Sequence, residues 1–284
     1  MTALPIQAPV TPPPVPSAYA DVVIWRFVGV RPDGRLALRF TTALRRAVMS
    51  RVEDPLPEAL HGHGTPGRPH MAFLALPWVG EPNADGRLLG LAVAVPHLDA
   101  ADRERVHRGL LNRPAVHAFP LHVPGIGRVY LRYEPGLIGP TALDPRRWRR
   151  GSRHWVSATP VVLDRYPHRG DVAAEVTRSL RTTGLPAKAT ITTLEVNTRP
   201  LQPGALRLHP DDLPPLARGR LYRHVAVTFD EPVAGPILIG AARHLGIGLL
   251  TPNPEHRPSA RPSARPAATR SAGRIPPGPL RAVR

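Results

Sequence analysis

Apolar positions along the first half of the chain alternate between helical spacing and strand spacing. Around Leu44 and Val48 the apolar residues recur three or four positions apart, which favours a helix, whereas residues 128–133 alternate as a strand does. Asp99 is placed to cap a second helix, and a turn-forming cluster at 83–86 separates two apolar runs. The expected elements are a strand at 22–27, a helix at 41–52, strands at 71–76 and 88–95, a helix at 99–113 and a strand at 128–133.

The second half repeats this order with different spacing. Asp171 is placed to cap a helix whose Val176 and Leu180 face inward, and Gly184 is placed to end it. The remaining elements are strands at 155–163, 189–196 and 222–229, followed by a helix and a strand within 236–250. We therefore expect an α+β protein with tandem ferredoxin-like (RRM-like, βαββαβ) domains at 19–138 and 139–254. The two halves are not visibly similar, so this expectation rests on element order.

The segment Gly235–Leu250 combines glycines with basic side chains. Pro236 is suited to the first turn of a helix, and Gly246 and Gly248 permit a turn that brings backbone close to a ligand. Arg243 and His244 beside that turn indicate an anionic ligand. The segment lacks the Lys-Ser/Thr of a phosphate loop and the GxGxxG order of dinucleotide sites. The alternative is a tight connection in which glycines only relieve steric strain.

The charge of the chain also points to an anionic partner. There are 38 basic and 21 acidic residues, a net charge of +17, and Lys188 is the only lysine. Guanidinium groups pair with phosphate and stack on bases, which favours nucleic acid, although basic blocks are often only solvated. Residues 1–18 and 255–284 have compositions typical of disorder, and the second of these tails contains seven arginines and no acidic residue after Glu255.

Several classes of protein are disfavoured by what the sequence lacks. The absence of cysteine excludes disulfide scaffolds and thiolate chemistry. No apolar run approaches the length of a membrane span, and the N-terminus lacks the features of a signal peptide. We expect a soluble, cytoplasmic protein without a membrane partner.

Histidines gather between the first expected helix and the second strand, at His61, His63 and His70. Imidazole suits general acid or base catalysis because its pKa lies near neutral pH. A solvated loop is the alternative, and a metal site lacks a local carboxylate or cysteine to complete it. His224 lies on a strand face, where it either touches RNA or lines a polar surface.

An arginine cluster separates the two expected domains. Guanidinium groups there are suited to hold a phosphate backbone, while Trp148 or Trp155 stacks on an unpaired base. An exposed linker with incidental charge is the alternative. The basic members are Arg146, Arg147, Arg149 and Arg150.

Four motifs in order resemble a known family. Arg68–Gly80, Ala84–Val95, Thr159–Arg165 and Gly235–Leu250 are similar to the type I-G (formerly I-U) CRISPR-associated proteins, a Cas-five/Cas-six fusion family. The resemblance covers about residues 20–252 and the repeat-processing endoribonuclease half, of the RAMP superfamily. Ala242 stands where the family pattern has glycine.

The resemblance implies a metal-independent enzyme without a cofactor. Such an enzyme cleaves CRISPR precursor RNA within each repeat, leaves a 2′,3′-cyclic phosphate, and keeps the mature guide RNA in a type I effector complex with other subunits. It implies His63 as the leading acid or base and His70 as the second candidate, with Arg46 neutralising charge. The RNA-binding residues it implies are Gly240, Arg243, His244, Gly246 and Gly248.

Two alternatives remain at the level of sequence. One is a non-catalytic subunit that binds the repeat or guide RNA. The other is a general arginine-rich nucleic-acid-binding protein without repeat specificity, whose binding falls steeply with salt.

Overall fold

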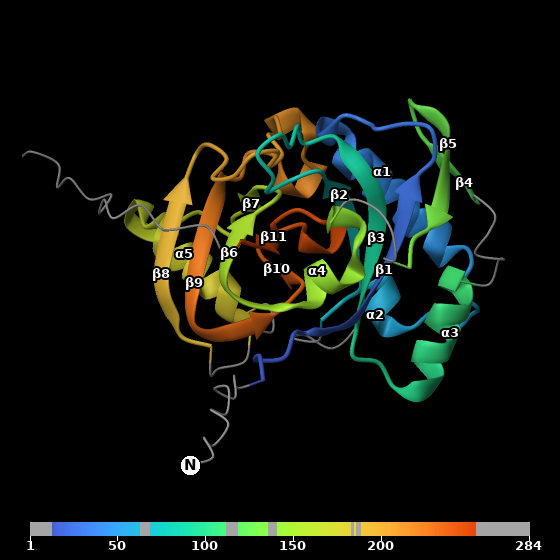
Figure 1. Cartoon of the computed structure of the whole chain (residues 1–284), viewed down its shortest axis with the longest axis horizontal. Helices are drawn as coiled ribbons and strands as arrows, with labels where there is room; N and C mark the ends of the chain where they lie inside the picture. Colours follow the sequence, from blue (N-terminus) through green and yellow to red (C-terminus); the bar gives the residue numbers. More distant parts are fainter. Residues whose placement is uncertain are drawn as a thin grey trace, which may run out of the picture.

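The protein is built around two antiparallel sheets. The structure is a computed structural model, which describes residues 13–62, 69–111, 119–135, 141–182, 185 and 189–253. The sheets lie side by side, with the helices of the first unit on one side of its sheet (Figure 1). The N-terminal segment 1–12, the C-terminal tail after residue 253, His63 and Gly184 lie outside the described residues.

The first sheet has the ferredoxin-like order β2-β3-β1-β5, extended by β4 at one edge. Two helices cover one face of this sheet, because Val23, Trp25 and Phe27 of β1 point into a core with Phe40, Leu44 and Val106. Asp99 accepts a hydrogen bond from the backbone N–H of Asp102 at 2.8 Å, as its capping role predicts. The elements are β1 (Tyr19–Phe27), α1 (Ala37–Met49), α2 (Glu58–His61), β2 (Ala72–Pro77), β3 (Leu88–Pro96), α3 (Ala100–Leu111), β4 (Phe119–Val123) and β5 (Gly127–Tyr133).

The second sheet contains the order β8-β9-β6-β11, which corresponds to the order β2-β3-β1-β5 of the first sheet. Asp171 accepts a hydrogen bond from the backbone N–H of Ala174 at 2.9 Å, and the helix after it buries Val176 and Leu180 against this sheet. The tandem ferredoxin-like fold is therefore confirmed. The elements are α4 (Pro145–Arg149), β6 (Gly151–Ser157), β7 (Val161–Val162), α5 (Val172–Thr182), β8 (Ile191–Asn197), β9 (Tyr222–Ala234), β10 (Ile237–Leu238) and β11 (Leu249–Pro252).

The helix expected at the start of 236–250 does not form. Pro236 follows a cis peptide bond and leads into the short strand β10, which pairs with β11. A single 3-10 turn, η6 (Arg243–Leu245), stands where the second helix of a ferredoxin-like unit is expected. A strand forms instead of a helix because Ile237 and Leu238 are buried on opposite sides of the chain, in two different cores.

The second unit packs against the face of the first sheet that its helices leave open. Val22 and Ile24 of β1 meet Leu238 and Leu249 of the second unit, with Trp148 buried between them. The two units therefore share an apolar interior.

Residues 13–18 differ from the expectation of an unfolded segment. Val15 is buried in the core of the second unit and forms a parallel bridge with Val233. Its N–H donates to the carbonyl of Pro232 at 2.8 Å, and its carbonyl accepts from the N–H of Ala234 at 2.8 Å. Among the described residues, no helix is long and apolar enough to cross a bilayer.

Candidate functional site

The glycine-rich segment of the second unit lies directly on the first unit. The turn η6 contacts β2 and α1. A Cβ at Gly246 would lie 2.7 Å from the carbonyl oxygen of Phe73, so only glycine allows this approach. Thr159 Oγ1 donates to the carbonyl of Gly246 at 3.0 Å and accepts a hydrogen bond from the N–H of Leu249 at 2.8 Å.

These glycines approach the protein's own backbone. A Cβ at Gly248 would clash with the carbonyl of Ile239, and one at Gly240 with the carbonyl of Val162. The N–H of Gly240 donates to Ser179 Oγ at 2.8 Å, and Ser179 in turn donates to Asp164 at 2.8 Å. The need to avoid a steric clash with the protein's own backbone therefore accounts for Gly240, Gly246 and Gly248, as the second interpretation of this segment predicts.

Ala242 adopts a left-handed conformation, with φ 62° and ψ 15°, at the position where the resembling family has glycine. This region is strained for a residue with a Cβ, so Ala242→Gly should raise the free energy of unfolding by up to about 1 kcal/mol. Urea unfolding followed by circular dichroism measures this change. Gly240→Ala is the matched control and should lower stability; a loss of stability in Ala242→Gly as well would contradict the strain argument.

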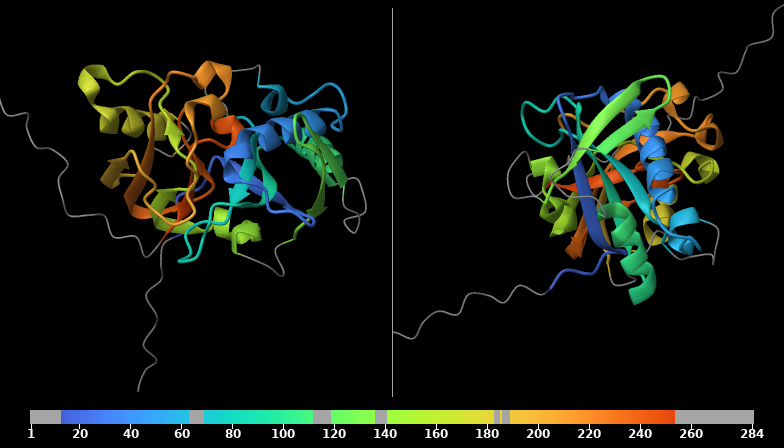
Figure 2. Two further views of the ribbon diagram at one scale, coloured as in Figure 1. Left: turned by 90° about the horizontal axis from the view of Figure 1, so that it is seen from above. Right: turned by 90° about the vertical axis from the view of Figure 1, so that its right-hand side faces the viewer.

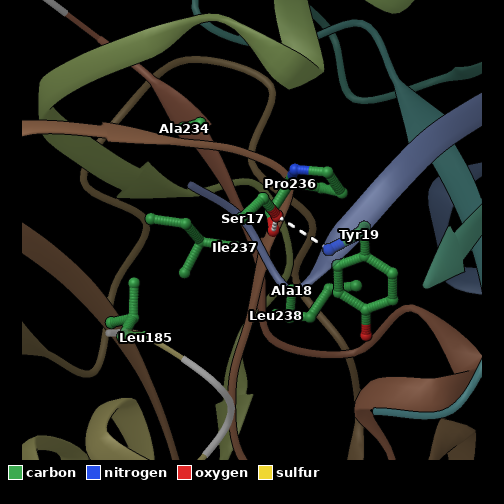
Figure 3. A pocket seen from close by; sticks show the side chains of 8 residues that line it. All are labelled: Ser17, Ala18, Tyr19, Leu185, Ala234, Pro236, Ile237 and Leu238. Carbon is green, nitrogen blue, oxygen red and sulfur yellow. Dashed lines mark hydrogen bonds between the residues drawn. The ribbon is translucent and has the colours of Figure 1, made fainter. Parts of the chain in front are cut away.

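The start of the glycine-rich segment is anchored by the N-terminal segment (Figure 3). Ser17 Oγ donates to the carbonyl of Pro236 at 3.2 Å and accepts from the N–H of Tyr19 at 3.1 Å. Burial raises the pKa of Tyr19 to about 12, against a smaller opposing effect of Arg243. The small cavity of about 10 Å³ beside these residues is too small for a substrate.

Histidines and arginines from both units meet at the docked turn. His244 in η6 is exposed, yet desolvation lowers its pKa, and the nearby charges of Arg45, Arg243 and His70 lower it further. Arg45 on α1 donates to the carbonyl of His61 at 3.1 Å, which ties α1 to the end of α2. We call His70, His244, Arg45 and Arg243 the junction cluster.

Two members of the junction cluster differ in how they are held. Arg243 donates to the carbonyl of Gly240 at 3.2 Å and lies 3.8 Å from a carboxylate oxygen of Asp164. His70 Nδ1 is buried and has no hydrogen-bond partner within the part of the chain that the structure describes. A buried, unpaired imidazole nitrogen is costly unless it is used, which marks His70 as a candidate for chemistry.

A basic groove of about 420 Å³ lies between the segment 211–218 and α1, the helix that also carries Arg45 of the junction cluster. Arg46 is one helical position from Arg45 and is exposed on the groove wall. Asp212 pairs with Arg35 at 3.3 Å, which offsets one positive charge. The other arginines that line the groove are Arg39 and Arg218.

The interdomain arginines lie elsewhere. α4 packs on the face of the first sheet opposite to α1, as the left view of Figure 2 shows. Arg147 is 13% exposed in its side chain and donates to the carbonyl of Val79 at 2.8 Å, so its guanidinium has a structural role. Arg146, Arg149 and Arg150 are exposed, with Arg146 paired to Asp144 at 3.0 Å and Arg149 lying 3.5 Å from Asp21.

Three aromatic or imidazole side chains for which RNA contact was one of the alternatives are buried. Trp148 donates to the carbonyl of Ala142 at 2.9 Å, and Trp155 donates to the carbonyl of Ser152 at 2.9 Å. Both are 0% exposed, so neither stacks on a base. His224 is also buried, beside Ser157 Oγ at 3.1 Å, and burial lowers its pKa to about 4, with a smaller effect of Arg207.

The family model of a CRISPR-associated protein, the GSU0054 family, matches residues 26–188, more than half of the chain. The chain belongs to this CRISPR-associated family. The matched region of this GSU0054-family protein includes α1, His70 and β2, but ends before the glycine-rich segment.

Solved structures also resemble this GSU0054-family protein, at low identity. The Cas6 (TTHB231) product complex has a TM-score of 0.38 and 14% identity, covering 83% of this chain and 100% of that chain. A CRISPR-associated protein Cas6 has a TM-score of 0.38 and 12% identity, covering 81% of this chain and 97% of that chain. No curated protein matches this chain.

The sequence alone missed Arg45, Arg39 and Arg218 as site residues. Arg45 and Arg46 are adjacent, but helical geometry turns one toward α2 and the other into the groove. Arg218 follows the 3-10 turn η5 (Pro215–Ala217), whose approach to α1 depends on contacts between the two units. The hydrophobic period of α1 was the one available signal, since it predicts which side of the helix is exposed.

Proposed function

We propose that this protein is a metal-independent endoribonuclease that cleaves CRISPR precursor RNA within its repeats. The observation that carries the proposal is the junction cluster, where imidazoles and guanidiniums from two units converge on α1, the helix that also lines a basic groove. Membership of a CRISPR-associated family supports an RNA substrate of this class.

The reaction needs three functions from the protein. A base removes the proton from the ribose 2′-OH as its oxygen attacks the adjacent phosphorus, and an acid protonates the 5′ oxygen as the P–O5′ bond breaks. Cations stabilise the charged phosphorane between these steps. The products are a 2′,3′-cyclic phosphate and a 5′-OH.

The described residues are suited to these functions. Desolvation lowers the pKa of His244, which favours the neutral imidazole that accepts a proton, and His70 supplies a second imidazole. Arg45 and Arg243 supply guanidinium groups suited to stabilise the phosphorane. Arg46, with Arg39 and Arg218, is suited to hold the phosphate backbone along the groove.

His63 remains the leading acid or base from the family resemblance. His63 lies in the sequence between α2 and β2. At one end of this stretch His61 accepts a hydrogen bond from Arg45, and at the other end the chain continues into His70, so both ends lead to the junction cluster. We also propose that the enzyme is of the type I-G kind and that the mature guide RNA stays bound in an effector complex.

Incubation of the full chain with labelled repeat RNA in EDTA tests the function. The expected result is one cut within the repeat, with a 2′,3′-cyclic phosphate identified by mass spectrometry. Binding of the repeat RNA without a cut, across pH and salt, would contradict catalysis and leave an RNA-binding subunit.

A further inference from the structure

The hairpin at the far edge of the first sheet exposes a face that neither helix nor second unit covers among the described residues. Along β5 the side chains of Val129, Leu131 and Tyr133 face the core, and those of Arg128, Tyr130 and Arg132 face outward. β4 alternates in register, so His122 lies opposite Arg128 and Pro120 opposite Tyr130. The hairpin is at the upper right of Figure 1, at the edge of the sheet opposite to β2.

This outward face is the continuation of the face that buries Trp148. Arg26 on β1 pairs in register with Arg132, on the same side as Val22 and Ile24. The sheet face thus changes from apolar, where the second unit covers it, to basic and aromatic, where it ends. We call Arg26, Arg128, Tyr130 and Arg132 the hairpin platform.

The chemistry of the hairpin platform is that of a stacking surface. Tyr130 is 45% exposed, and two arginines flank it on the same strand face, each about 7 Å away along the strand. Arg26 is 3.7 Å from Glu134, whereas the guanidinium groups of Arg128 and Arg132 have no hydrogen bond or ion pair with the described residues. An aromatic ring between two guanidiniums is suited to a base with a phosphate on either side.

We propose that the hairpin platform binds single-stranded nucleic acid, with a base stacked on Tyr130 and the flanking phosphates on Arg128 and Arg132. The excess of arginine and the absence of acidic side chains on the outward face of the described hairpin strands favour a polyanion over a protein partner. This site is separate from the junction cluster, and its binding does not require cleavage.

Fluorescence anisotropy with labelled 12-nucleotide oligoadenylate, as RNA and as DNA, tests this site. Stacking on an aromatic side chain is worth about 1–3 kcal/mol per base, so Tyr130→Ala should weaken binding roughly 5- to 150-fold. Tyr130→Phe should bind within about twofold of wild type, because it retains the ring. Equal binding of RNA and DNA would indicate recognition of base and phosphate alone, and preference for RNA would indicate an added 2′-OH contact.

Two matched controls separate the platform from general charge. Tyr166, 78% exposed in the second unit, should tolerate alanine without loss of affinity. Arg128→Gln with Arg132→Gln should reduce the salt dependence of binding by a slope of about 1.4, whereas Arg103→Gln with Arg199→Gln should not, although the charge removed is equal.

Wild-type affinity in Tyr130→Ala, or no oligonucleotide binding by the wild-type chain, would overturn the proposal. Since Tyr130 is exposed, thermal unfolding should confirm that each variant is folded. The assay follows binding of an oligoadenylate that contains no CRISPR repeat, so failure of the cleavage proposal leaves this result unaffected.

Discussion

Alanine at His63 or His70 should slow the cleavage of repeat RNA by about 10²–10⁴-fold and leave RNA affinity within a few-fold of wild type. The physical reason is that an acid or base acts on protons that move only during the reaction, whereas affinity depends on phosphate contacts. Single-turnover cleavage, with binding measured separately by filter retention, distinguishes the two effects.

The matched control is His168→Ala, which removes an exposed imidazole in the second unit, in a 3-10 turn that ends just before α5. This variant should cleave at the wild-type rate. Wild-type cleavage by both His63→Ala and His70→Ala would exclude these imidazoles from the reaction. A parallel loss of affinity and rate would instead assign them to RNA binding.

Alanine at Trp148 should lower the free energy of unfolding by about 3–5 kcal/mol, because the side chain is fully buried between the two units. It also leaves the carbonyl of Ala142 without its hydrogen-bond donor. Urea unfolding measures the loss. Trp148→Phe should cost less because it retains most of the apolar volume.

RNA binding by Trp148→Phe decides between packing and base stacking for this residue. Unchanged affinity agrees with a buried packing role, and Tyr166→Ala serves as the control for stability, since an exposed ring contributes little. Weaker RNA binding with unchanged stability in Trp148→Phe would show that the tryptophan contacts RNA.

Local signals in the sequence predicted most of the fold. Hydrophobic periods and the caps Asp99 and Asp171 act within a few residues, so they predicted α3 and α5 without knowledge of the tertiary structure. Positions decided by distant contacts were not predictable in this way. Pro236 is typical of a helix start, but the burial of its neighbours in two cores draws the chain into β10.

The candidate site was predictable only in part, because its arrangement also depends on contacts between distant parts of the chain. The sequence offered His70, Arg46, Arg243 and His244 as candidates, but the meeting of His70 with His244 depends on Gly246 lying against β2. For Trp148 the sequence left two alternatives open, stacking on an unpaired base or a place in an exposed linker, because an aromatic residue among arginines is compatible with both. In the short helix α4 the ring of Trp148 points inward and is buried, while the neighbouring Arg149 is exposed.

The bridge between Val15 and Val233 means that the second unit is completed by a segment that precedes the first unit in the chain. During synthesis, residues 13–18 leave the ribosome long before β9 exists to receive them. The second unit is therefore not a contiguous piece of the gene, and cutting the chain near residue 139 would take the buried Val15 segment away from the unit that it completes.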